Sequence, residues 1–397
     1  MISKYMQPKL AGNSVIRQMF EEGKRLAKIY GPENVYDFSL GNPNVTAPDA
    51  VREAMIDILQ NEDPLKVHGY MSNAGFEETR KAIADDLNAR FGTSYGFENV
   101  VMTAGAGSSL NITLKTIVDP GDEVMVFAPY FVEYNSYIGN YGAVPVVVSP
   151  DEASGFMPNI EDMKQKITAR TKAVLINSPN NPTGAVYTEE AIRALAEALK
   201  EKQAEFGTVI YIICDEPYRE LVYGDAVVPH VPDYYDNTIV CYSYSKSLSL
   251  PGERIGYVLV PPQSDNAAEF IDTVTIANRI CGIVNAPSLV QLAIARCVDA
   301  KADVAFYEKN GSDLYRGLTE AGYTCVKPSG AFYLWVKTPD PDDSAFVACL
   351  KNEERILVTP GSAFCGPGYM RISYCVAHET IMNALPGFAR VIEKYRG

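Results

Sequence analysis

Short, almost continuous apolar segments alternate with segments of helical periodicity between residues 99 and 260, and this alternation constrains the fold most. Such runs are typical of a mostly parallel sheet that helices cover on both faces. The predicted strands are residues 99–103, 123–128, 144–149, 172–177, 208–215, 238–245 and 254–260. The predicted helices between them are 107–118, 131–140, 159–167 and 188–203. The sequence therefore predicts an α/β fold with a seven-stranded, mostly parallel sheet.

The pattern changes after about residue 285. A long helical region at 288–320 is followed by strand-like and helical segments in turn, which are AFYLWV (331–336), a helix near 343–353, ILVTPGSAF (356–364), MRISY (370–374) and a final helix. This order predicts a smaller α+β domain, which the N-terminal segment joins. The expected division is 1–44 for the N-terminal arm and part of the small domain, 45–290 for the large domain, and 291–397 for the C-terminal small domain.

Charge and cysteine usage exclude several classes of protein. The 397 residues include 49 acidic and 35 basic side chains, and the net charge of −14 argues against nucleic acid or an anionic membrane as a partner. The N-terminus shows no signal-peptide pattern, and no apolar stretch reaches the ~18 residues of a membrane span. The eight Cys are scattered and do not cluster with the three His, so we expect no metal site, no disulfide framework and a cytoplasmic location.

The octet NSPNNPTG (177–184) directly follows a predicted buried strand. Its two prolines exclude an interior strand or a helix interior. Asn, Pro and Gly are the ordinary residues of turns, so the octet is consistent with a simple turn. It is equally consistent with a ligand site, because ligands of open α/β sheets bind beyond the carboxyl ends of the strands.

Two other strand ends carry residues with the same ambiguity. AGAGSS (104–109) opens a helix, and its small residues would let backbone N–H groups face an anion, or would simply make a tight turn. PYFVEY (129–134) supplies aromatic side chains. Phe131 or Tyr130 could stack on a flat ring, although packing in the core is the more common use of such residues.

Two charged residues stand at the ends of strongly apolar strands. Asp215 is expected to be partly buried and to need a cation or a donor, or else to cap the following helix. Lys246 is unusual at the end of an interior strand; it fits Schiff-base chemistry, or a side chain that reaches solvent. Arg254 follows eight residues later.

Taken together, the residues at these strand ends supply the groups that one type of ligand needs. An anion cradle, an aromatic ring, amides, a buried carboxylate, a Lys and an Arg would lie along one sheet edge. A pyridine aldehyde phosphate needs these groups, because its phosphate requires N–H donors and a cation, its ring nitrogen a carboxylate, and its aldehyde an amine.

At this level of detail the chain resembles the fold-type I pyridoxal-phosphate aminotransferases, in the class I/II, aspartate aminotransferase-like group. NSPNNPTG, the D-E-x-Y at 215–218, SYSKSLSLPGERIGY (243–257) and MRISY occur in the family's order and at its spacing. The resemblance covers nearly the whole chain, and it implies pyridoxal 5′-phosphate (PLP) as the cofactor.

The resemblance implies roles for residues around the cofactor ring. Lys246 would form the Schiff base and then shuttle the substrate proton, and Asp215 would pair with the pyridinium nitrogen. Asn181 and Tyr218 would hydrogen-bond the ring oxygen, while Phe131 would stack on the ring. The catalytic residues would accordingly be Lys246, Asp215 and Tyr218.

The resemblance also implies contacts to the phosphate and to the substrate. The expected phosphate ligands are Gly105, Ala106, Gly107, Ser243 and Arg254. Tyr70 matches a tyrosine that reaches the phosphate of the neighbouring subunit, which implies a homodimer with shared sites. Arg371 would clamp the substrate α-carboxylate, Gly41 lies in the loop that closes over it, and Asn181 would also contact the substrate.

Two positions bear on whether the substrate is aspartate, and only the first departs from the pattern of relatives that act on it. Some of these carry a Lys at the position of Gly107, where it reads the side-chain carboxylate. Others use a partner-subunit Arg near the position of Arg279. The sequence therefore leaves open which amino acid and which oxo acid are the substrates.

The leading functional prediction is an aminotransferase that moves an amino group between an L-amino acid and a 2-oxo acid by a ping-pong cycle. A carbon–sulfur β-lyase or a decarboxylase could use the same groups. A non-catalytic, cofactor-binding regulator is less well supported, because only about 35 residues precede the site segments and the chain is acidic.

Overall fold

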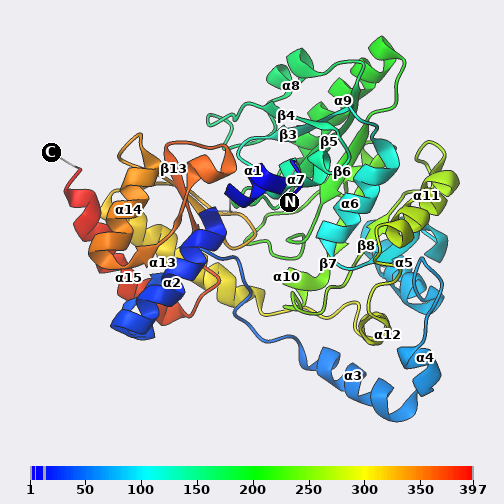
Figure 1. Cartoon of the computed structure of the whole chain (residues 1–397), viewed down its shortest axis with the longest axis horizontal. Coiled ribbons are helices and arrows are strands. Elements are labelled where there is room, and N and C mark those ends of the chain that lie inside the picture. The colour runs from blue at the N-terminus through cyan, green and yellow to red at the C-terminus, as the bar shows by residue number, and fades with distance from the viewer. Residues whose placement is uncertain (1, 5, 12–14, 396–397) are drawn as a thin grey trace. The chain divides into compact units, whose positions relative to one another are not determined.

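The computed structural model describes residues 2–4, 6–11 and 15–395. They form two compact units, and Figure 1 follows the chain through them by colour. The larger unit consists of residues 45–180 and 185–304, and the rest of the described chain forms the smaller unit. The sequence-based division differs in two places: residues 291–304 belong to the larger unit, and residues 181–184 belong to the smaller one.

The larger unit contains a seven-stranded sheet in the order β2-β8-β7-β6-β5-β3-β4. Its strands are β2 (Val100–Thr103), β3 (Glu123–Phe127), β4 (Val144–Val148), β5 (Thr171–Asn177), β6 (Tyr211–Asp215), β7 (Thr238–Ser243) and β8 (Gly256–Leu259). Only β8 runs against its neighbours β2 and β7, whereas the other pairs are parallel. The predicted α/β fold with a mostly parallel seven-stranded sheet is confirmed.

Helices of the larger unit cover this sheet or pack against the helices that cover it (Figure 1). They are α3 (Asp49–Asn61), α4 (Pro64–His68), α5 (Glu77–Phe91), α6 (Ala106–Ile117), α7 (Glu133–Gly139), α8 (Ile160–Lys166), α9 (Glu189–Phe206), α10 (Tyr244–Ser247), α11 (Ala267–Ile280) and α12 (Ser288–Arg296). Helix α9 shows how the local sequence sets the bounds. The Thr188 side chain accepts a hydrogen bond from the Ala191 N–H (3.2 Å), and Gly207 ends the helix in the left-handed conformation.

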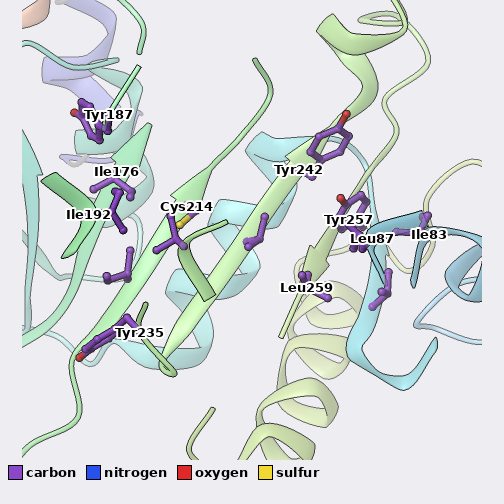
Figure 2. Packing of buried hydrophobic residues seen from close by; sticks show 14 of the residues in the cluster. Ile83, Leu87, Ile176, Tyr187, Ile192, Cys214, Tyr235, Tyr242, Tyr257 and Leu259 are labelled. Carbon is purple, nitrogen blue, oxygen red and sulfur yellow. The ribbon is translucent and has the colours of Figure 1, made fainter. Parts of the chain in front are cut away.

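The core of the larger unit lies on both faces of the central strands. Ile212, Ile213 and Cys214 are successive residues of β6, and all three are buried. Because successive side chains of a strand point to opposite faces, this burial requires cover on both sides. Figure 2 shows part of this core, including Tyr242 and Tyr257, whose rings stack on neighbouring strands with centroids 4.9 Å apart.

The smaller unit contains two sheets. The short strands β1 (Tyr36–Asp37) and β11 (Ile356–Leu357) pair in parallel. The antiparallel sheet has the order β12-β13-β10-β9 and consists of β9 (Thr324–Val326), β10 (Tyr333–Lys337), β12 (Thr359–Pro360) and β13 (Tyr369–Ser373). The helices of this unit are α1 (Met6–Ala11), α2 (Val15–Tyr30), α13 (Val304–Ala321), α14 (Asp343–Glu354) and α15 (His378–Glu393). None of the described helices is both long and apolar enough to span a membrane.

Two helical segments differ from the sequence analysis. Helix α11 has no predicted counterpart, because its segment IDTVTI is rich in β-branched residues and Asn266 makes no side-chain cap. The long helical region at 288–320 is broken between α12 and α13. In this break the Ala302 N–H donates to the Ser247 carbonyl (3.0 Å), so the backbone pairs with the end of α10 instead of continuing a helix.

Candidate active site

Six strand ends and one strand start share one edge of the large sheet. Strands β2 to β7 all point their carboxyl ends to this edge, whereas the antiparallel β8 begins there. The register pairs Ser243 with Gly256, and Gly256 with Thr103. Arg254, which precedes β8 by two residues, is therefore brought to the same edge as Lys246, which follows β7.

Asp215 is the last residue of β6, and only one oxygen of its buried carboxylate accepts a hydrogen bond. Its Oδ2 accepts a hydrogen bond from the Tyr134 hydroxyl (2.6 Å), and the Asn177 side chain donates to its backbone carbonyl (2.8 Å). Its Oδ1 is buried and has no hydrogen-bond partner among the described residues. Burial raises the pKa of Asp215 to about 7, with a smaller contribution from Glu216, while the Tyr134 hydrogen bond opposes the rise. A buried carboxyl of this kind needs a further donor or cation.

Tyr134 is not among the site residues predicted from the sequence, although it lies in the segment PYFVEY (129–134). Tyr134 belongs to α7 and is fully buried, and burial raises the pKa of its phenol well above the ordinary value. Its ring meets the Phe131 ring edge-on, with centroids 5.6 Å apart. The three-residue spacing places both rings on one side of the turn, and this spacing is the signal that could have identified Tyr134.

Lys246 lies in the single helical turn α10, directly after β7. The predicted strand 238–245 ends at Ser243, whose side chain accepts a hydrogen bond from the Ser245 N–H (3.2 Å) and so caps this turn. Lys246 is half-buried, whereas Tyr244, Ser245 and Ser247 are buried. The cap therefore fixes where the backbone leaves the sheet, and with it the position from which the Lys246 side chain extends.

The start of α6 combines free N–H groups with a nearby cation. Gly105 caps the helix with a positive φ of 82°, so Ala106 and Gly107 provide the first N–H groups, which no helical carbonyl can satisfy. A Cβ atom at Gly105 would lie 2.8 Å from a guanidinium nitrogen of Arg254. The Arg254 side chain donates to the carbonyls of Pro251 (2.9 Å) and Ala104 (3.2 Å). This arrangement suits an anion.

In the smaller unit, Arg371 is held by carbonyl acceptors and aromatic rings. It lies on β13 and is 2% exposed. Its guanidinium donates to Asn181 Oδ1 (2.9 Å) and to the Ser39 carbonyl (2.6 Å), and it lies over the rings of Tyr333 (4.5 Å) and Phe364 (4.6 Å). These contacts orient the planar fork that recognises carboxylates.

Two glycines of the smaller unit are required by close packing. A Cβ atom at Gly41 would lie 2.0 Å from the Tyr333 hydroxyl oxygen. At Gly184, which has a positive φ of 72°, a Cβ atom would lie 2.6 Å from the Tyr333 carbonyl. Substitution at either position would therefore displace Tyr333, one of the two rings against Arg371.

The octet 177–184 is both a turn and a link between the units. Its first four residues belong to the larger unit, where the Asn180 N–H donates to the Ala185 carbonyl (2.8 Å) and closes the turn. Its last four belong to the smaller unit, where Asn181 contacts Arg371. The amides of Asn177 and Asn180 thus have structural partners, as the turn interpretation predicts.

The structure brings most of the predicted site residues together within each unit. In the larger unit the shared edge carries Gly105, Ala106, Gly107, Asp215, Ser243, Lys246 and Arg254, with Phe131 joined to Asp215 through Tyr134. Tyr218 follows Asp215 closely and is 5% exposed. Arg371, Asn181 and Gly41 belong to the smaller unit. Tyr70 is 95% exposed, and the single chain does not place it with the others.

Comparison with known proteins gives consistent matches over most or all of the chain. The family model described as aminotransferase class I and II matches residues 33–387. A crystal structure of an amino transferase from Eubacterium rectale shares 46% sequence identity and superposes with a TM-score of 0.97 over all of both chains. A probable aspartate/prephenate aminotransferase from Aquifex aeolicus is 34% identical over 91% of this chain and 92% of that protein. The structure of aspartate aminotransferase from Thermus thermophilus with maleate has a TM-score of 0.84 at 29% identity, covering 95% of this chain and 96% of that one.

Proposed function

Because the chain belongs to the class I and II aminotransferase family and is an aminotransferase, we propose that it uses PLP to move an amino group between an L-amino acid and a 2-oxo acid. The observation that carries the cofactor assignment is the unpartnered, buried Oδ1 atom of Asp215. A protonated pyridine nitrogen is the donor that this atom lacks.

The other residues of the sheet edge fit the same cofactor. The start of α6 and Arg254 offer N–H donors and a cation to a phosphate, and Phe131 offers a ring face. When bound, the cofactor would supply an electron sink for the electrons released at the substrate Cα. The residues that would hold it are Tyr70, Gly105, Ala106, Gly107, Phe131, Asn181, Asp215, Tyr218, Ser243, Lys246 and Arg254.

The protein's own residues would bind the reactants and move one proton. Lys246 would provide the amine that is exchanged for the substrate amine, and it would take the proton from the substrate Cα and later return it. Asp215 keeps the ring nitrogen protonated during both halves of a ping-pong cycle. Tyr218 and Asn181 would donate to the ring oxygen, and Gly41 would belong to the loop that closes over the substrate.

We assign Arg371 to the substrate α-carboxylate, because its fork is already oriented by Asn181 and Ser39. Arg371→Lys should raise KM for the amino acid about 10- to 100-fold, since the Lys variant loses a charge-assisted hydrogen bond. Steady-state kinetics measure this change. Arg355→Lys is the matched control, because Arg355 lies outside the proposed site and donates to the Asn34 carbonyl (2.9 Å). Equal KM values for Arg371→Lys and the wild type would contradict the assignment of Arg371 to the substrate α-carboxylate.

A half-reaction screen tests the proposed function. Purified enzyme loaded with PLP is mixed with each common L-amino acid in turn, beginning with aspartate, because relatives bear that name. At least one amino acid should change the visible absorbance, and a 2-oxo acid should restore it. Pyruvate and ammonia appearing without an added oxo acid would instead identify a lyase.

The same proposal includes a homodimer acting in the cytoplasm. Tyr70 and Leu65 are 95% and 83% exposed, and both lie at or just after α4. A tyrosine this exposed can reach a second copy of the chain, where it would contact the phosphate. Full activity in a species that sediments as a monomer would contradict the dimer.

A further inference from the structure

Tyr137 occupies the space beside Gly107. Tyr137 lies on α7, three residues after Tyr134, so both tyrosines project from one face of that helix. The Tyr137 hydroxyl oxygen is 3.4 Å from the position that a Cβ atom would take at Gly107. The hydroxyl therefore lies at the first turn of α6, in contact range of the position where a side chain at residue 107 would begin.

The surroundings of Tyr137 show which groups its hydroxyl faces. Burial is the main cause that raises the pKa of Tyr137 to about 12, the charges of Glu133 and Asp215 add to the rise, and Arg254 opposes it. The phenol is consequently neutral and able to donate near neutral pH. No described residue accepts a hydrogen bond from it, although the side chain is only half exposed.

The cap and first two residues of helix α6 offer no side-chain donor to an anion, whereas the hydroxyl of its third residue, Ser108, is buried without a hydrogen-bond partner among the described residues. The cap and first two residues are Gly105, Ala106 and Gly107, none of which has a polar side chain. The Ser109 hydroxyl is already bonded to the Thr103 hydroxyl (2.7 Å). Besides the proposed ligands Ser243 and Arg254, the anion site at this helix would therefore draw its donors from backbone N–H groups, the Ser108 hydroxyl and neighbouring elements.

We infer that the Tyr137 hydroxyl is a further donor, and that it binds an anionic oxygen of the cofactor phosphate at the start of α6. This assignment rests on the proposed function, to which it adds one phosphate ligand. A Cβ atom at position 107 would be in ordinary van der Waals contact with this hydroxyl, at 3.4 Å. The same chemistry, an anionic oxygen, also occurs in the side-chain carboxylate of an acidic substrate, so the test must separate the two.

The test compares two cofactor forms that differ only in the phosphate. Full-length wild type and Tyr137→Phe, both stripped of cofactor, are titrated with PLP and with pyridoxal, and binding is followed by absorbance. Tyr137→Phe should bind PLP about 10- to 100-fold more weakly, since one hydrogen bond to a charged group is lost. Its affinity for pyridoxal should equal that of the wild type, and inorganic phosphate should compete less well with PLP.

Tyr141→Phe is the matched control, because the Tyr141 hydroxyl contacts Asn111 Oδ1 (3.4 Å) and lies outside the proposed site. It should leave both affinities unchanged. Equal weakening of PLP and pyridoxal by Tyr137→Phe, as a folding defect would produce, overturns the inference. Unchanged cofactor binding with a raised KM for acidic substrates also overturns it and assigns the hydroxyl to the substrate. Failure of the wild type to bind PLP would overturn the proposed function itself.

Discussion

Lys246→Ala is expected to lower kcat by about 10³- to 10⁴-fold and to abolish covalent attachment of the cofactor. The variant loses both the amine that is exchanged with the substrate and the group that moves the proton, and positioned proton transfer alone contributes up to ~10⁴-fold. The attachment is measured by mass spectrometry of the intact chain after borohydride reduction. Wild type should gain the mass of one reduced cofactor, and Lys246→Ala should gain none.

Lys301→Ala serves as the control for Lys246→Ala. Lys301 is exposed and lies in the same unit, so its removal changes the net charge equally without touching the sheet edge. It should retain both the mass gain and the activity. A mass gain that persists in Lys246→Ala would show that another amine binds the cofactor, and the assignment of Lys246 would be wrong.

Asp215→Asn is expected to lower kcat by about 10²- to 10⁴-fold. Removing one partner of a buried charge pair costs ~3–5 kcal/mol, and each ~1.4 kcal/mol is a factor of ten. Asp215→Glu keeps the carboxylate and should recover part of the loss. PLP affinity, measured by absorbance titration, should fall in Asp215→Asn as well. If Asp215→Asn keeps both its activity and its PLP affinity, the carboxylate does not face the ring nitrogen.

In the chain without cofactor, Asp215→Asn should be favourable, because it should raise the stability of the folded state relative to wild type at neutral and higher pH. The pKa of Asp215 rises on folding from 3.8 to about 7, so between these values the folded chain holds a proton that the unfolded chain releases. The stability that this group contributes is present below about pH 4 and is lost as the pH rises to 7, by up to ~4 kcal/mol at ~1.4 kcal/mol per pKa unit. Denaturant unfolding measures the free energy of unfolding of both chains without cofactor. The value for Asp215→Asn minus that for wild type should therefore be larger at about pH 8 than at about pH 5. A difference that is independent of pH would contradict the burial argument.

The sheet could be predicted from the sequence because both of its faces are covered. Strands such as β5 and β6 are short apolar runs between helices, and this pattern has few other structural solutions. The positions of Asp215 and Lys246 followed from the strand ends alone. Their roles came from the family resemblance and remain predictions, as do those of the other site residues.

Other features depend on contacts that are distant in the sequence. The break before α13 is fixed by a hydrogen bond from Ala302 to Ser247, which no local pattern reveals. Tyr134 and Tyr137 look like ordinary helical tyrosines until the fold places them beside Asp215 and Gly107. The four residues 181–184 join the smaller unit through partners such as Arg371, which is 190 residues away in the sequence.

Because β8 runs antiparallel to β7, one short connection between them carries two proposed cofactor-binding residues. Residues 244–255 link β7 to β8, and this single segment carries both the proposed attachment amine, Lys246, and the phosphate cation, Arg254. Fraying of this hairpin would release the coenzyme at both anchors at once. Conversely, coenzyme loading should lock the hairpin, so holoenzyme amides in β7 and β8 would exchange with deuterium more slowly than those of the stripped chain.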